Sequence, residues 1–120
     1  MSEVIDVRSL SHAQLLDVYL PATARILRDE DGSVIAIWGL AWGDARCWLW
    51  FHVENYRPGY GLTVLKEARR MFRMAAQLGE TRIYAPRDAS FETSERLLKL
   101  LGFELNGHEQ GFEIWTREVP

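Results

Sequence analysis

Residues 54–65 read ENYRPGYGLTVL. In this stretch a single residue separates Gly59 from Gly61, Arg57 precedes them, and an apolar pattern with helical spacing follows. The start of a helix exposes unpaired N–H groups and carries about half a positive charge, so it attracts anions. Glycines would let the backbone approach a phosphate where a Cβ would intrude, and Arg57 could add a forked contact. The same residues also fit a plain Pro-Gly turn beside a solvated arginine, so the stretch alone leaves both interpretations open.

Patterns on both sides of this stretch predict alternating strands and helices. Apolar runs bounded by turn residues predict strands, and apolar residues recurring every three or four positions predict helices. The predicted strands cover residues 4–7, 24–28, 33–42, 45–53, 82–85, 103–105 and 112–119, and the predicted helices begin near Ser11, Leu62 and Ser90. We therefore expect one α+β domain over residues 1–120, with a mixed, mostly antiparallel sheet of about six to seven strands and about three helices.

Turn residues divide these elements. Asp31-Gly32 predicts a tight hairpin, because glycine accepts positive φ without steric cost, and Gly43-Asp44 is a second turn candidate. Pro86 is expected to close the strand before it, and NGHEQG, residues 106–111, to form the loop of the final hairpin. Both faces of residues 47–53 are mostly apolar, which predicts a strand in the middle of the sheet.

Composition excludes several classes of protein. The formal net charge of −3 and the absence of a basic stripe argue against nucleic acid as a partner. No apolar run is long enough to span a membrane, and the N-terminal residues do not resemble a signal peptide. A single cysteine, Cys47, suits a reducing compartment, so we expect a cytoplasmic protein.

Two familiar phosphate-binding motifs do not fit the glycine stretch. The Walker loop needs a glycine directly before Lys66, where Leu65 stands. The dinucleotide pattern G-x-G-x-x-G begins correctly at Gly59 but has Val64 in place of its third glycine, and the parallel sheet that surrounds it is missing.

Residues 53–61, VENYRPGYG, and residues 94–103, SERLLKLLGF, carry a resemblance to a third family. The first resembles the strand end and pyrophosphate loop of the Gcn5-related N-acetyltransferases, the GNAT superfamily, and the second is similar to that family's late helix. The resemblance extends along nearly the whole chain. It implies acetyl-CoA bound between the fourth and fifth strands, together with an amine acceptor from a small molecule or a protein. Residues implied in cofactor binding are Val53, Arg57, Gly59, Tyr60, Gly61 and Leu62.

Three positions depart from the family pattern. Arg57 stands two residues before Gly59, where the pattern has three, so the loop is one residue short or shifted in register. The late helix of the family often carries a tyrosine that protonates the departing thiolate, and Leu98 stands at the matching position. The asparagine that often opens this helix is replaced by Phe91.

Acyl transfer to an amine needs a neutral nucleophile, and holding a lysine-like amine neutral at pH 7 costs about 4–5 kcal/mol. A general base is therefore useful. Glu54 and His52 are candidates for that base, and Tyr56 or Tyr60 could protonate the thiolate. The non-catalytic alternatives are that Glu54 is a solvated residue at a strand end and that His52 is a hydrogen-bonded histidine in the core or a cleft. The pair has no evident third ligand for a metal site.

A second hypothesis is a GNAT-shaped protein without chemistry that binds and modulates a macromolecular partner. The departures at Leu98 and Phe91 favour it, as does the load of five tryptophans, most of them expected in the core. Homodimer formation is also conceivable if the last strand, residues 112–119, lies at a sheet edge.

Overall fold

The computed structural model describes residues 3–7, 24–53, 59–87 and 92–119. The predicted first helix, the N-cap Ser90, and the site candidates Glu54, Tyr56 and Arg57 lie outside the described residues. None of the described helices is long and apolar enough to cross a membrane.

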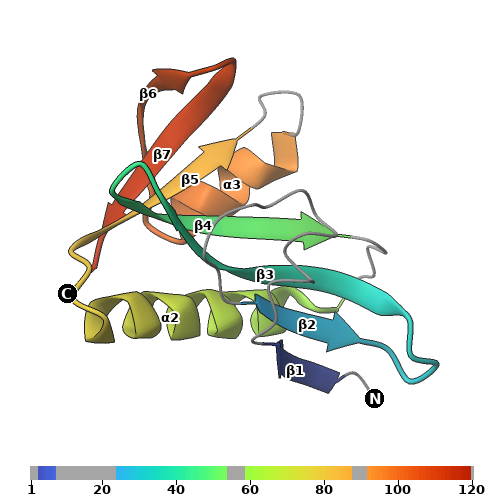
Figure 1. Ribbon diagram of the computed structural model, residues 1–120. Coiled ribbons are helices and arrows are strands. Elements are labelled where there is room, and N and C mark those ends of the chain that lie inside the picture. The colour runs from blue at the N-terminus through green and yellow to red at the C-terminus, as the bar shows by residue number, and fades with distance from the viewer. Residues whose placement is uncertain (1–2, 8–23, 54–58, 88–91, 120) are drawn as a thin grey trace.

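The described elements form one mixed sheet and two helices (Figure 1). The strands are β1 (Glu3–Val7), β2 (Ala24–Arg28), β3 (Val34–Gly43), β4 (Arg46–Val53), β5 (Arg82–Arg87), β6 (Glu104–Glu109) and β7 (Phe112–Glu118), and the helices are α2 (Gly61–Gln77) and α3 (Glu92–Leu100). The order across the seven-stranded sheet is β1-β2-β3-β4-β5-β7-β6. All neighbours pair antiparallel except β4 and β5, which confirms the expected mixed, mostly antiparallel sheet.

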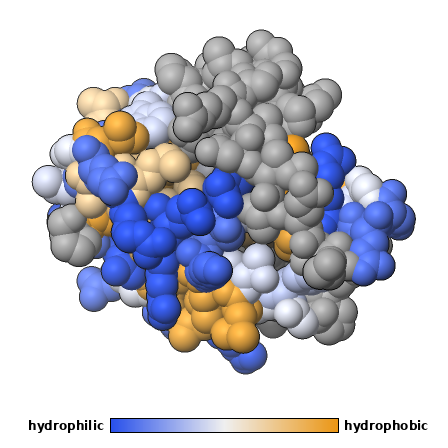
Figure 2. Space-filling view, turned by 90° about the horizontal axis from the view of Figure 1, so that it is seen from below, coloured by the Kyte–Doolittle hydropathy of each residue, from blue (hydrophilic) through white to orange (hydrophobic). Residues whose placement is uncertain are grey.

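The main core lies between the sheet and the two helices. Met71 and Ala75 of α2 are fully buried there, together with Cys47 of β4, and Leu98 of α3 joins the same cluster. Pairing of Trp38 with Phe51 and of Trp42 with Cys47 places these side chains on the helix-covered face. The basic residues of α2 are exposed on its outer side, and Figure 2 shows a mostly hydrophilic described surface there.

Central placement of β4 is confirmed, because three strands lie on each side of it. Alternation along β4 sends Cys47, Leu49 and Phe51 toward the helices, whereas Trp48 and Trp50 face the other way. Trp50 packs there against a smaller cluster that contains Ile26 and Ile37.

Three expectations for the C-terminal half are wrong. Pro86 does not close β5, which continues to Arg87, because β5 has no paired neighbour on its β4 side beyond Tyr84 and proline is tolerated at such an edge. Residues 106–109 extend β6 instead of forming a loop, since Gly107 (φ 121°) sits at a register shift and allows a bulge.

The last strand is also not an edge strand. β7 pairs with β5 on one side and with β6 on the other, because β6 folds back along its outer side. Strand addition at β7 therefore offers no route to a homodimer.

The β3–β4 hairpin holds a strained residue that gives a stability prediction. Its two turn residues, Asp44 (φ 54°) and Ala45 (φ 58°), both have positive φ, although neither is glycine. Replacing Ala45 with glycine is expected to raise the free energy of unfolding by about 0.5–1 kcal/mol, because glycine adopts this conformation without a Cβ clash. Urea denaturation measures the change.

The reverse substitution, glycine to alanine at Gly32, is the control. Gly32 also has positive φ (84°), in the β2–β3 turn, so Gly32→Ala should lower stability by a similar amount. An Ala45→Gly variant that unfolds at a lower urea concentration than the parent would contradict the turn geometry.

Candidate active site

The most unusual feature of the sheet is the divergence of its two central strands. β4 and β5 run parallel, and their register contains a single pair, Trp48 with Tyr84, whereas β3 and β4 are paired at eight positions. Beyond that pair the strands separate, as the diverging arrows of Figure 1 show. Among the described residues, β4 therefore has no register partner on β5 beyond Trp48, so this edge of the strand faces the gap between the two strands.

A cavity of about 260 Å³ lies at this splay. Its walls come from β3, β4, β5, α2 and α3, and the lining is mainly apolar: Trp38, Leu49, Trp50, Phe51, Val64, Glu67, Ala68, Ala85, Pro86, Arg87, Leu97, Leu98 and Leu101. Apolar walls with a few polar groups are typical of sites that bind small molecules and cofactors. Leu98, the position where the family's tyrosine was expected, is buried on this wall.

The chain leaves β4 and enters α2 at an uncapped helix start. The first helical hydrogen bond of α2 runs from Val64 N–H to Tyr60 C=O at 3.0 Å, so the amides before Val64 precede the helical ladder. Among the described residues no side chain caps this end, and no acidic residue lies in the first turn. Three amide donors, from Gly61 to Thr63, are thus presented together with the positive end of the helix dipole.

The two glycines of this loop have different conformations. Gly59 has φ 98°, which favours glycine, and Gly61 is the first residue of α2 with no positive φ. A Cβ built on Gly61 would meet no described atom within 4 Å. Protein packing around the described residues therefore gives no reason for glycine at position 61.

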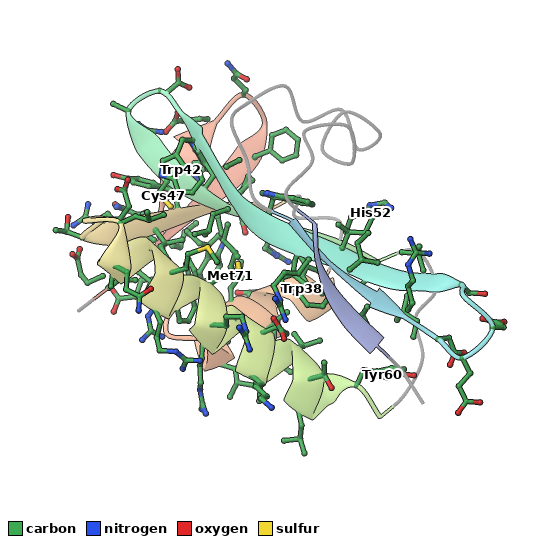
Figure 3. All side chains as sticks on the ribbon, turned by 60° about the horizontal axis from the view of Figure 1, so that its bottom comes forward. Trp38, Trp42, Cys47, His52, Tyr60 and Met71 are labelled. Atoms are coloured by element: carbon green, nitrogen blue, oxygen red, sulfur yellow. The ribbon has the colours of Figure 1, made fainter. Side chains whose placement is uncertain are left out.

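The predicted site residues that the structure describes lie around these features. Val53 ends β4, and Tyr60 and Leu62 flank Gly61 at the start of α2. The Leu62 side chain is 83% exposed, so only its backbone is placed to take part. The Tyr60 ring packs against the main core. In Figure 3, Tyr60 lies at the beginning of α2 and Trp38 between the sheet and that helix.

His52 lies near the end of β4 on the opposite face of the sheet from α2. Its register partner is Ile37, and its side chain is exposed. Among the described residues no three His, Cys, Asp or Glu side chains are grouped to hold a metal ion.

A buried ionic cluster closes the β5 side of the cavity. Arg87 is 6% exposed, donates a hydrogen bond to Glu113 of β7, and lies 3.9 Å from Glu95 of α3. Trp115 Nε1 also donates to Glu113, at 3.0 Å. The Arg87 guanidinium and then Trp115 Nε1 hold the pKa of Glu113 below its usual range, so Glu113 stays ionised and is suited to positioning Arg87 rather than to accepting a proton.

Cys47 is excluded as a nucleophile. It is fully buried, and burial, followed by the charge of Glu80, raises the pKa of its thiol to about 12. A thiol protonated to that degree is inert at neutral pH.

On the face away from the helices, aromatic and cationic groups gather where the splay begins. The Trp48 and Tyr84 rings lie 5.5 Å apart, and the Arg46 guanidinium lies over both, at 5.6 and 5.0 Å from the ring centres. Arg46 also pairs with Glu109 of β6 at 2.8 Å. This cluster fastens the β6–β7 hairpin to β4 where the two halves of the sheet meet.

Sequence reasoning missed the polar side chains on the cavity wall. Glu67 is 6% exposed and receives two hydrogen bonds from Arg25 of β2, at 2.6 and 3.2 Å. Nothing local indicates this contact, because the partners lie 42 residues apart. Arg87 could have been found from the period-two pattern of Ile83, Ala85 and Arg87, had Pro86 not been interpreted as the end of the strand.

No protein-family model matches this sequence, and no curated protein matches it. Solved structures do. An IAA acetyltransferase from Bacillus cereus ATCC 14579 superposes with a TM-score of 0.74 at 14% identity, covering 99% of this chain and 100% of the other. An acetyltransferase of the GNAT family from Staphylococcus aureus Mu50 gives 0.71 at 10% identity, covering all of both chains. The spermidine/spermine N-acetyltransferase SpeG from Vibrio cholerae gives 0.68 at 12% identity, over 99% and 95%. The chain therefore has the fold of the Gcn5-related N-acetyltransferases.

Proposed function

We propose that this protein is an acetyl-CoA-dependent N-acyltransferase that acts on an amine of a small molecule or a protein. The observation that carries the proposal is the splay of β4 from β5, which opens an apolar cavity beside an unpaired strand edge. The loop after β4 leads to an uncapped helix start with no acidic residue in its first turn. A chain of amides ending in a diphosphate fits this sequence of features, because the strand edge suits the amides and the helix amides suit the diphosphate.

In this proposal the backbone of β4 near Val53 binds the pantetheine arm, and the amides from Arg57 to Leu62 bind the pyrophosphate. Gly59 and Gly61 leave room for the approach, and Arg57 adds a charged contact. Acetyl-CoA supplies an activated thioester carbonyl. The walls formed by α2 and α3 keep water from the thioester while the amine enters from the face that carries His52.

Proton transfer is assigned to residues at the end of β4. Glu54 or His52 removes a proton from the incoming ammonium, directly or through water, and Tyr56 or Tyr60 returns one to the thiolate. The Leu98 side chain has no acidic proton to donate. Protonation of the thiolate, the role of the tyrosine that often stands at this position in the family, therefore passes to another group.

Calorimetric titration with acetyl-CoA tests the proposal. We expect one site per chain, with a dissociation constant between about 1 μM and 1 mM, the range usual for enzyme substrates. Titration with adenosine diphosphate, which lacks the pantetheine arm, should give much weaker binding. Absence of heat at millimolar acetyl-CoA would exclude the acyltransferase.

A kinetic prediction separates the two candidate bases. Once an acceptor amine is found, replacing the true base with an isosteric neutral residue should lower kcat/KM by about 10²- to 10⁴-fold, without changing acetyl-CoA affinity. Glu54→Gln and His52→Gln should therefore differ sharply in kcat/KM. The variant with the lower kcat/KM should also lose the acid limb of its pH–rate profile. Equal, small losses in both variants would show that neither residue is the base.

Two observations favour a second candidate function. Leu98 is 8% exposed on the cavity wall and offers no proton to a leaving thiolate, and Phe51, Leu105 and Phe112 are large apolar side chains at least 42% exposed. These features suit a GNAT-fold protein that binds a macromolecular partner without catalysis. Release of free thiol from acetyl-CoA in the presence of an amine panel supports the enzyme, whereas cofactor binding without turnover favours the binding protein.

A further inference from the structure

Two of the tryptophans that line the splay cavity each have a buried indole N–H without a hydrogen-bond acceptor. Among the described residues, three buried side-chain atoms lack a partner: Trp38 Nε1, Trp50 Nε1 and Arg117 Nε. The first two belong to residues that line this one cavity. Buried polar groups in native proteins are almost always satisfied, so two orphan donors at one site point to an acceptor that a ligand brings.

The other tryptophans of the chain show that this pattern is specific. Trp42 Nε1 donates to Glu80 at 3.1 Å, and Trp48 Nε1 donates to the Gly43 carbonyl at 3.0 Å. Trp115 Nε1 donates to Glu113, also at 3.0 Å. The indoles of the other three tryptophans are satisfied by the protein, whereas those of the two tryptophans among the cavity-lining residues are not.

Packing holds both rings in place. The Trp38 side chain is 3% exposed and stacks on Phe51, with ring centres 6.0 Å apart and planes at 24°. Trp50 packs against Ile26 and Ile37 on the other face of the sheet. A rotation that found another acceptor would break these contacts, so the indoles are fixed in the positions that a ligand would meet.

The donors approach from opposite faces. Register pairs Trp38 with Phe51 and Gly39 with Trp50, which places Trp38 on the face covered by α2 and α3, and Trp50 on the face that carries His52. β4 has left β5 at this level, so a ligand chain can pass between them. An indole N–H is an uncharged donor without acceptor capacity, and a carbonyl oxygen suits it, as in the bond from Trp48 Nε1 to the Gly43 carbonyl.

We propose that Trp38 and Trp50 are positioning residues that donate hydrogen bonds to carbonyl oxygens of an acyl or amide chain in the splay. This inference rests on the proposed function, because the thioester and amide carbonyls of acyl-coenzyme A are the acceptors of this kind. Trp38 holds the chain from the helix-covered face. Trp50 contacts it where the acyl group meets the acceptor.

The test is ¹⁵N NMR of the indole N–H groups during titration of the whole chain with acetyl-CoA. The five tryptophans give five indole signals. The variants Trp38→Phe, Trp50→Phe, Trp42→Phe and Trp48→Phe assign four of them, and the remaining signal belongs to Trp115. We expect the Trp38 and Trp50 protons to move downfield and to exchange more slowly with water. The Trp42 and Trp48 signals, already bonded within the protein, should stay in place.

Affinity gives a second readout. Trp38→Phe and Trp50→Phe should each weaken acetyl-CoA binding about three- to tenfold, the effect of one lost hydrogen bond, whereas Trp42→Phe should not.

The outcomes separate this inference from the proposed function. If acetyl-CoA shifts the backbone amide signals of residues 59–63 but not the indole signals of Trp38 and Trp50, the proposed indole contacts are wrong and the acyltransferase proposal stands. No shift anywhere overturns the acyltransferase and the contacts together. Equal shifts of all five indoles indicate a general rearrangement and also overturn the specific contacts.

Discussion

Replacing Gly61 with alanine is expected to weaken acetyl-CoA binding by about 10- to 100-fold without destabilising the protein. Position 61 is the first residue of α2 and has no positive φ, so alanine fits its backbone and should favour the helix by at most about 0.5–1 kcal/mol, the value for a helix interior. The new methyl group meets no described atom of the protein within 4 Å. It would, however, occupy the space through which a diphosphate reaches the amides, and such an overlap costs about 1–3 kcal/mol.

Opposite signs for stability and affinity make this prediction sharp. Urea denaturation and calorimetric titration of one protein preparation measure both quantities. Leu62→Ala is the matched control, because the Leu62 side chain is 83% exposed and the substitution keeps its amide. Gly61→Ala with unchanged affinity would place the diphosphate elsewhere, and a large loss of stability would show that glycine serves the fold.

The glycine loop shows what the sequence could and could not decide. From the sequence, Gly59 and Gly61 were both interpreted as residues that let the backbone approach a phosphate, since both are glycines before an apolar helical pattern. The backbone separates them: the φ of 98° at Gly59 is a need of the chain itself, and Gly61 has no such need. A sequence pattern reports the residue type but not the φ angle, so only the structure could assign a separate reason to each position.

Elements with local causes were predicted well. The turn at Asp31-Gly32, the two apolar faces of β4 and the helix that ends before Gly79 depend on neighbouring residues, and all three are present. The register of β4 against β5 was not predictable in this way. A splay is the absence of pairing, and it leaves no mark in the composition of either strand.

The orphan indoles and the buried carboxylate also lay beyond sequence reasoning. Five tryptophans in a chain of 120 residues suggested a core role, but which of them find an acceptor depends on contacts such as Trp42 with Glu80, 38 residues away. Glu67 stands between Lys66 and Ala68 on an amphipathic helix, where an acidic residue usually faces water. Such contacts exist only once the sheet and helices are assembled.

Replacing Arg25 with methionine is expected to lower the free energy of unfolding by about 3–5 kcal/mol, the largest stability effect we predict. The Arg25 and Glu67 side chains are 12% and 7% exposed, and their closest N–O distance is 2.6 Å. Without Arg25, the one described cation left near the Glu67 carboxylate is Arg70, at 3.7 Å and beyond hydrogen-bond distance. An inadequately paired buried charge is costly.

The double variant tests that reason directly. Replacing a buried ion pair with apolar residues of similar size is often neutral, so Arg25→Met with Glu67→Leu should recover most of the stability that Arg25→Met loses. Arg28→Met, on the same strand but with its guanidinium bonded to the Gly32 carbonyl in an exposed turn, is the control and should change stability by less than about 1 kcal/mol. Because Glu67 also lines the splay cavity, the double variant removes a buried charge from its wall. If the double variant is no more stable than Arg25→Met, the loss comes from packing of the arginine side chain under β2, and the carboxylate is not its cause.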